Sequence, residues 1–358
     1  MTPAQPGPPA PANWLLRIPE IFAPWTTGIL DLLDASRCTP LGPEFVLIQG
    51  GSPDKWQGGP ATPFIPWNLP VQHSWPCHPP KMDNFVEKAA QTLCKKFGPL
   101  QPQAIQMGPL LTGAPDRYYK GLASNLRGRT LQLFPGLSGA APAESQDPEI
   151  PTLFALVGKE GLFAGMHTPR ASNGFHPGGT KFISQGAADT ISRAGAKIAE
   201  ALHYLLLHRP DLPAGSHWLE LGASPGGMTS ELLRRGYRVT ALDRAPLDRR
   251  LNGQPGLTFT KADVATFTPP PGTLYDALLC DMNGDARHAL RQVIRLTKFM
   301  RPGGLIVFTL KTPGSGTFAA IQQTLRLTLR DASVAGLKTI ALTHLTYNRQ
   351  EFTGFFEI

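Results

Sequence analysis

The chain has 358 residues, of which 41% are hydrophobic and 17% charged; this is typical of a folded protein of two domains and excludes a wholly disordered one. No apolar run is long enough to span a membrane, and the N-terminus lacks the basic and then apolar pattern of a secretory leader, so we expect neither. The four cysteines form no CxxC pair, which argues against zinc ribbons and disulfide frameworks and favours a reducing, cytoplasmic location.

Proline and tryptophan are concentrated at the start of the chain. Residues 1–80 hold 17 of the 37 prolines and five of the six tryptophans. Because proline breaks long helices and central strands, we expect short strands, turns and irregular loops there, with the first dozen residues disordered. The tryptophans are expected to fill a small core, and the alternative is a surface that stacks RNA bases.

The rest of the first half predicts one helix and one hairpin. Residues 82–97 place apolar side chains at helical spacing. Residues 152–158 and 162–167 are apolar runs separated by Lys-Glu-Gly, which is typical of a β-hairpin. Between helix and hairpin, residues 136–151 are rich in Gly, Ala, Pro and Ser and indicate an exposed loop. We therefore expect an N-terminal α+β domain over residues 1–170.

Strands and helices alternate in the second half. A loop over residues 169–179 leads to a helix that begins near Ile191 and ends before Pro210. Strands are expected at residues 218–221, 238–242, 275–280, 304–310, 339–345 and 352–358, and helices at residues 228–235, 286–297 and 318–330. This alternation predicts an α/β, Rossmann-like, doubly wound and mostly parallel sheet over residues 171–358. Such sheets bind ligands at the carboxyl ends of their strands.

The excess positive charge lies in the second half. Residues 1–170 hold 13 basic and 12 acidic side chains, whereas residues 171–358 hold 21 and 14. The second half therefore carries a net charge of +7 out of the +8 of the whole chain. This asymmetry favours a polyanionic partner such as RNA; the alternative is a generally basic protein with no such partner.

A glycine loop follows the first strand of the expected sheet and opens the next helix. It reads Gly222-Ala223-Ser224-Pro225-Gly226-Gly227 and precedes Met228. Glycines let the backbone approach a ligand closely, and a helix N-terminus offers unpaired N–H groups. The loop does not match the dinucleotide pattern G-x-G-x-x-G, and Pro225 lacks an N–H that a pyrophosphate would use. These features favour a less anionic ligand that carries a carboxylate and a nucleoside.

Two acids follow the next two strands of the expected sheet. Asp243 closes the second strand, where a carboxylate can bind ribose hydroxyls. Asp263 follows the third strand, where it can reach an adenine amino group. An acid at either position alone is more often a solvated loop residue than a ligand-binding one. Together with the glycine loop, they favour a site for S-adenosylmethionine.

The run LELGASPGGMTSELL resembles the first motif of the FtsJ-like ribose methyltransferases, which act on RNA 2′-hydroxyls with S-adenosylmethionine. That family carries a Lys–Asp–Lys–Glu tetrad. The segments SRAGAK, CDM, TLK and NRQEFT are similar to the family's tetrad segments and imply the catalytic residues Lys197, Asp281, Lys311 and Glu351. The expected cofactor-binding residues are Gly222, Ala223, Ser224, Pro225, Gly226, Gly227, Met228, Asp243, Asp263 and Asp281.

Within that family, residues 165–182, with PGGTKF, are similar to the segment that precedes the catalytic domain in the RlmM type. Those enzymes methylate a cytidine ribose in bacterial large-subunit ribosomal RNA and carry an N-terminal THUMP domain that binds RNA. The resemblance covers residues 152–358 and implies a THUMP-like region in the second half of residues 1–170. Met228 stands where the family usually has tryptophan, and Ser224 where the RlmM type has cysteine.

Two lysines in one pocket suit methyl transfer to a hydroxyl, which is a poor nucleophile and needs a base. A lysine has an ordinary pKa near 10.4, about three units above the neutral pH at which a base has to be unprotonated. Burial or a second ammonium group nearby lowers the pKa of a lysine. The resemblance and the chain order make Lys311 the expected base, and Lys197 the residue that orients the hydroxyl. Asp281 and Glu351 are expected to hold the two ammonium groups in place.

Two other functions fit parts of the sequence. A non-catalytic RNA-binding protein could retain the same sheet, although it would have no use for the tetrad. A small-molecule or protein methyltransferase would share the cofactor fold, although the charge of residues 171–358 disfavours it. No His or Cys spacing indicates a metal site. The oligomeric state is left open by the sequence.

Overall fold

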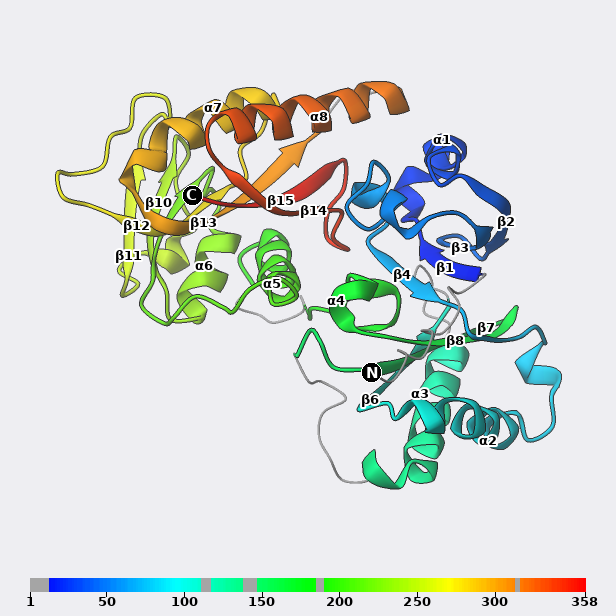
Figure 1. Ribbon diagram of the computed structural model, residues 1–358. Coiled ribbons are helices and arrows are strands. Elements are labelled where there is room, and N and C mark those ends of the chain that lie inside the picture. The colour runs from blue at the N-terminus through cyan, green and yellow to red at the C-terminus, as the bar shows by residue number, and fades with distance from the viewer. Residues whose placement is uncertain (1–12, 111–116, 138–146, 185–189, 313–315) are drawn as a thin grey trace, which may run out of the picture. The chain divides into compact units, whose positions relative to one another are not determined.

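The computed structural model describes residues 13–110, 117–137, 147–184, 190–312 and 316–358 (Figure 1). Contacts divide the chain into two compact units, Met1–Gly179 and Thr180–Ile358. The disordered start expected for the first dozen residues lies outside the described residues, as does most of the loop expected at residues 136–151.

The N-terminal unit contains two four-stranded sheets. The first is antiparallel, with the order β2-β3-β1-β4. Its elements are β1 (Asn13–Arg17), α1 (Thr26–Asp31), β2 (Ala35–Leu41), β3 (Phe45–Gly50) and β4 (Trp67–Pro70). Short strands linked by turns are what a proline-rich sequence permits. Trp14, Trp56 and Trp67 are buried, which confirms core packing for these three, whereas Trp25 and Trp75 are partly buried.

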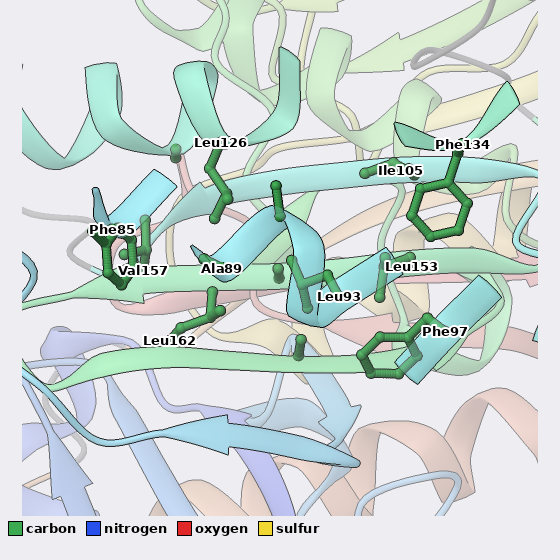
Figure 2. Close-up of a cluster of buried hydrophobic side chains, with 14 residues drawn as sticks. Phe85, Ala89, Leu93, Phe97, Ile105, Leu126, Phe134, Leu153, Val157 and Leu162 are labelled. Carbon is green, nitrogen blue, oxygen red and sulfur yellow. The ribbon is translucent and has the colours of Figure 1, made fainter. Parts of the chain in front are cut away.

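The second sheet has the order β5-β8-β7-β6 and is mixed, because β6 runs parallel to β7. Its elements are β5 (His73–Trp75), α2 (Phe85–Phe97), β6 (Ala104–Pro109), α3 (Arg117–Leu133), β7 (Thr152–Gly158) and β8 (Gly161–His167). The expected hairpin is confirmed as β7 and β8. The apolar stripe of α2 (Phe85, Ala89, Leu93 and Phe97) is buried against this sheet, together with Leu126 of α3 (Figure 2).

The C-terminal unit is one seven-stranded sheet in the order β11-β10-β9-β12-β13-β15-β14. Its strands are β9 (His217–Leu221), β10 (Arg238–Asp243), β11 (Leu257–Lys261), β12 (Tyr275–Cys280), β13 (Met300–Lys311), β14 (Lys338–Thr343) and β15 (Glu351–Glu357). Its helices are α5 (Ala194–Leu205), α6 (Gly227–Arg234), α7 (Ala286–Leu296) and α8 (Phe318–Val334). The central strands are parallel and mostly buried, which is typical of strands with both faces covered. The expected Rossmann-like, doubly wound sheet is confirmed.

The strand order reverses between β9 and β12. From β9 the chain runs outward to β10 and β11, and it then crosses to β12 on the other side of β9. Ligands of such sheets bind outside the carboxyl ends of the strands at this switch point. The strand β15 runs antiparallel to β13, so Glu351 at its start pairs with Lys311 at the end of β13. The antiparallel strand therefore begins at the same edge of the sheet at which the parallel strands end.

The segment 169–179 differs from the loop expected there. It contains a helical turn, α4 (Pro169–Ser172), and a 3-10 turn at Pro177–Gly179. Side chains of the first sheet hold it, since Asn68 donates to the Ala171 carbonyl and Arg17 to the Gly178 carbonyl. For this reason the boundary between the units falls after Gly179, not after residue 170 as the sequence suggested.

Candidate active site

The glycine loop lies at the switch point of the sheet, between β9 and α6. Gly222 has φ +81°, and a Cβ there would lie 2.9 Å from the Asp281 carbonyl oxygen. Gly226 has φ +107°, and a Cβ there would collide with Leu251. Both positions therefore favour glycine for their positive φ, and Gly222 also for its close approach to backbone. The loop brings backbone against the end of β12, where Asp281 donates its N–H to the Leu221 carbonyl at 3.0 Å.

The two acids that follow β10 and β11 have different surroundings. Asp243 is partly buried and holds the glycine loop, because its carboxylate accepts the N–H of Ser224 at 2.9 Å and that of Ala245 at 2.8 Å. Asp263 is more exposed, accepts the N–H of Ala265, and lies 3.7 Å from Arg244. Both follow neighbouring parallel strands at the carboxyl edge of the sheet.

Glu220 is a fully buried acid directly beneath the glycine loop. It lies on β9 and accepts a hydrogen bond of 2.6 Å from the Thr229 hydroxyl on α6. Burial raises the pKa of this carboxyl to about 8, against an ordinary value of 4.5, although the Thr229 bond opposes the shift. The carboxyl is therefore largely protonated at neutral pH and links β9 to α6 without a net charge.

The tetrad residues come from four separate elements. Asp281 follows β12, Lys311 ends β13, and Glu351 begins β15, so the sheet alone places these three at one edge. Lys197 comes from α5, in the first turns of the helix. A close approach of α5 to α6 fixes this helix: a Cβ on Gly195 would lie 2.9 Å from the Gly227 carbonyl oxygen.

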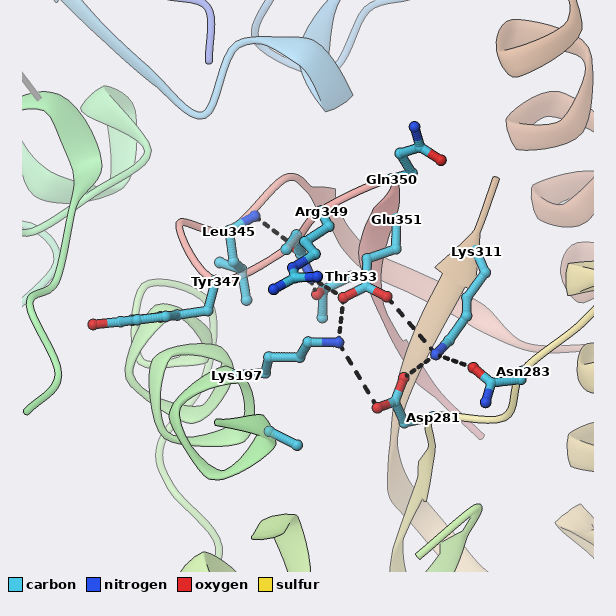
Figure 3. Close-up of polar contacts among 12 residues, drawn as sticks. Lys197, Asp281, Asn283, Lys311, Leu345, Tyr347, Arg349, Gln350, Glu351 and Thr353 are labelled. Carbon is cyan, nitrogen blue, oxygen red and sulfur yellow. Dashed lines mark hydrogen bonds and ion pairs between the residues drawn. The ribbon is translucent and has the colours of Figure 1, made fainter. Parts of the chain in front are cut away.

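The four tetrad side chains are in mutual contact (Figure 3). Lys197 forms ion pairs with Glu351 and with Asp281, the second at 3.9 Å. Lys311 Nζ lies 3.1 Å from Asp281 Oδ1 and 3.9 Å from Glu351 Oε2. The two ammonium groups point toward one another from α5 and β13, with one carboxylate on each side of them. All four side chains are largely buried, and each lysine retains some exposure (17–21%) through which a substrate can reach it.

The remaining expected site residues lie in or next to the loop. Ser224 donates its hydroxyl to the Pro246 carbonyl at 2.9 Å, and Pro225 accepts the N–H of Asp248 at 2.9 Å. Met228, on α6, is buried. The structure thus brings every expected residue to one edge of the sheet, and Asp263 is the most exposed of the acids among them.

Three residues at the site were not predicted from the sequence. Asn283 accepts a hydrogen bond of 2.9 Å from Lys311 Nζ, and Asn348 donates one of 3.4 Å to Glu351 Oε1. Glu200, one turn after Lys197, is buried and bonds to the loop that precedes Glu351. A sequence signal existed for Glu200, since it is an acid within the apolar run AKIAEALHYLLL.

Among the described residues, no group of His, Cys, Asp and Glu side chains is arranged to hold a metal ion. Cys280 is buried in the sheet, and burial raises the pKa of its thiol to about 12. None of the helices in the described part of the chain is long and apolar enough to cross a membrane.

The C-terminal unit is similar to a known protein family. Residues 190–328 match the model of a family described as FtsJ-like methyltransferase. These residues are therefore similar to an FtsJ-like methyltransferase domain. The matched range contains the glycine loop and three tetrad residues, Lys197, Asp281 and Lys311, and it ends before Glu351. The resemblance noted from the sequence is confirmed.

Several curated relatives share one name and match different lengths of this chain. Ribosomal RNA large subunit methyltransferase M of Thauera aminoaromatica is 31% identical over 172 residues, which cover 47% of this chain and 46% of the relative. The protein of that name in Halorhodospira halophila is 26% identical over 332 residues, covering 88% of this chain and 81% of the relative. The chain thus spans about half the length of the first relative. A solved structure, TrmN from Thermus thermophilus, aligns over 96% of this chain and 99% of its own at 13% identity, with a TM-score of 0.36.

Proposed function

We propose that this protein transfers a methyl group from S-adenosylmethionine to a ribose 2′-hydroxyl of RNA, in large-subunit ribosomal RNA and in the cytoplasm. The observation that carries the proposal is the contact of two lysines with two carboxylates at the switch point of the sheet. The name of the relatives supports ribosomal RNA as the substrate class. The net charge of residues 171–358 supports a polyanionic partner. The N-terminal unit is then the region that binds RNA, with a THUMP-like second half.

The loop and strand ends fit S-adenosylmethionine as the cofactor. Gly222 and Gly226 let the loop pack against the end of β12 and against Leu251, where a Cβ would collide, and this packing holds the loop at the switch point of the sheet. Each oxygen of Asp243 accepts one N–H and keeps a second lone pair, which can accept a ribose hydroxyl. Asp263 is exposed enough to accept an adenine amino group. When bound, the cofactor supplies an electrophilic methyl group on a sulfonium, which leaves activation of the hydroxyl oxygen to the protein.

The tetrad residues have separate roles in activating that oxygen. Lys311 loses its ammonium proton to solvent, to which it retains exposure, and the neutral amine is the base that takes the 2′-hydroxyl proton. It lies at the end of β13 beside Asp281. Asp281 and the Asn283 side-chain oxygen fix the direction of its Nζ. Lys197, held by Glu351, donates a hydrogen bond that orients the hydroxyl oxygen. Positioning and general-base catalysis of this kind are the two contributions that the residues can make.

The experiment that tests the function is a map of ribose methylation. Ribosomal RNA is compared between cells with the protein, cells without it, and cells that carry only Lys311→Ala. We expect one ribose methylation site to disappear in the second and third strains. An unchanged map would contradict the proposal. Restoration of the site by Lys311→Ala would favour the non-catalytic RNA-binding protein instead.

A further inference from the structure

Glu200 is a buried acid that the tetrad mechanism does not use. It lies on α5 one turn after Lys197, within a run of Ala, Ile and Leu, and only 3% of it is exposed. Burial of a carboxylate is costly unless hydrogen bonds or ion pairs compensate for it. A charged residue in this position therefore needs partners strong enough to retain it.

Two backbone N–H groups from the loop between β14 and β15 donate hydrogen bonds to Glu200. Thr346 donates to Oε1 at 3.0 Å and Tyr347 donates to Oε2 at 3.1 Å. These donors lie 146 and 147 residues further along the chain. Two hydrogen bonds to one carboxylate are charge-assisted and fix both distance and orientation. The carboxylate therefore fastens the loop to the helix that carries Lys197.

The same loop holds Glu351 through Asn348. The Asn348 side-chain oxygen accepts the N–H of Leu345 at 2.7 Å and the hydroxyl of Thr353 at 3.1 Å, and its amide group donates to Glu351 Oε1 at 3.4 Å. Figure 3 shows this loop above α5, with Lys311 and Asn283 across the site from Lys197. Glu351 Oε1 is also the oxygen that Lys197 contacts.

We infer that Glu200 is a positioning residue that sets the meeting point of Lys197 and Glu351. The contacts form a closed ring, which runs from Lys197 along one helical turn to Glu200, through the Thr346–Asn348 turn to Glu351, and back to Lys197. The inference rests on the proposed methyl transfer. Glu200 touches neither substrate nor cofactor in this role; it acts only through the two tetrad residues.

A glutamine at this position tests the role of the carboxylate. Its side chain has one acceptor oxygen and one donor NH2, so one of the two backbone N–H groups would face another donor. The loop then has to shift away from α5, and Glu351 shifts with it. A displacement of about 1 Å in a catalytic group lowers the rate about 100-fold.

Asp276 offers a matched control in the same unit. Its carboxylate accepts the N–H of His217 at 2.8 Å and lies 3.1 Å from Arg301, so it also ties separate elements together. It stands on β12 at the opposite end from Asp281. Glu200→Gln and Asp276→Asn therefore make the same chemical change, the first on α5 beside the tetrad and the second at the end of β12 that lies away from it.

The measurement is methyl transfer by the full-length protein to an unmodified transcript of large-subunit ribosomal RNA, with tritiated S-adenosylmethionine. For Glu200→Gln we expect kcat to fall at least about tenfold, while KM for both substrates stays within about twofold. For Asp276→Asn we expect kcat within about twofold of wild type. Thermal melting of both variants reports how much of each change is a loss of folded protein.

A second variant removes one donor and leaves Glu200 in place. Asn348 donates its N–H to the Leu345 carbonyl at 3.0 Å, so Thr346 is the second residue of a β-turn, a position that accepts proline well. Thr346→Pro deletes one N–H to Glu200, and we expect a smaller loss of kcat with KM unchanged. This variant keeps the test valid if Glu200→Gln does not fold.

The outcomes separate the inference from the proposed function. If the wild-type protein transfers no methyl group to RNA, the proposed function fails and the inference with it. If the wild type is active and Glu200→Gln and Thr346→Pro keep its kcat, the positioning role is wrong and the proposed function stands. Equal losses in Glu200→Gln and Asp276→Asn would mean that both carboxylates serve only the stability of the fold.

Discussion

Two ammonium groups and two carboxylates share a small, largely buried space at the edge of the C-terminal sheet. Their formal charges balance. This balance offsets the free-energy cost of burying them, since a buried charge without a partner is strongly destabilising. Loss of one lysine leaves two carboxylates with a single ammonium group. Each member of the tetrad therefore supports the positions of the other three as well as the reaction.

The first prediction concerns Lys311. We expect Lys311→Ala to lower methyl transfer by about 100-fold to 10,000-fold, the usual contribution of a general base. Its affinity for S-adenosylhomocysteine, measured by calorimetry, should stay nearly unchanged, because the glycine loop and Asp243 are intact. Lys338→Ala is the control, since Lys338 is an exposed lysine of the same sheet, on β14. Full activity in Lys311→Ala would end its assignment as the base.

The second prediction concerns Glu220 and pH. Because its pKa is about 8 in the folded protein and near 4.5 when exposed, the folded state binds more protons than the unfolded state between these values. Its contribution to stability is therefore fully present below pH 4.5 and is lost as the pH rises toward 8. We expect the melting temperature of the wild type to fall relative to that of Glu220→Gln across this range. A constant difference between the two proteins would contradict the raised pKa.

Sequence reasoning found the residues that end strands and missed those that act across the chain. Asp281 and Lys311 each follow an apolar strand, so the topology of the sheet predicts their meeting. Asn283 and Asn348 are small amides in loops, and nothing in their local sequence specifies a partner. Glu200 bonds to donors 146 and 147 residues away, a contact that no local pattern encodes.

At the scale of elements, we expect the glycine loop to be the part of the site that tolerates an added side chain least. We expect Gly222→Ala to destabilise the fold by more than Gly253→Ala does. Both positions have positive φ, a strain of about 1–2 kcal/mol for alanine. Only at Gly222 does a Cβ also meet a backbone oxygen, because nothing lies within 4 Å of a Cβ on Gly253.

Chemical denaturation and the affinity for S-adenosylhomocysteine measure this third prediction. Gly222→Ala should lower both the free energy of unfolding and the affinity, since Asp281 lies behind the loop. Gly253→Ala should lower the free energy of unfolding alone. Equal effects of the two substitutions on the affinity would show that the close approach to the end of β12 is unimportant.

The helices and strands of residues 171–358 could be predicted because the secondary-structure propensity of each segment agrees with its pattern of buried residues. The strand β12 is apolar apart from Asp276, and Asp285 precedes α7 and caps this helix by accepting the N–H of His288. The first half was predictable only in part. The strands β1–β4 pair at long range within a proline-rich sequence, so neither their number nor their order follows from local pattern.

At the scale of the whole molecule, the uneven charge predicts how RNA binding depends on salt. Residues 171–358 carry a net charge of +7, and each phosphate contact releases a counterion. We expect the dissociation constant for a large-subunit ribosomal RNA transcript to rise steeply with potassium chloride, as measured by fluorescence anisotropy. A dissociation constant that is independent of salt would indicate a small-molecule or protein substrate instead.

The central claim is that the tetrad directs a methyl group to a ribose oxygen. The most direct measurement incubates the purified full-length protein with S-adenosylmethionine and unmodified large-subunit ribosomal RNA, digests the RNA to nucleosides, and identifies the methylated product by mass spectrometry. We predict a single 2′-O-methylated nucleoside, absent with Lys311→Ala. A methyl group on a base, or the same product from Lys311→Ala, would contradict the account.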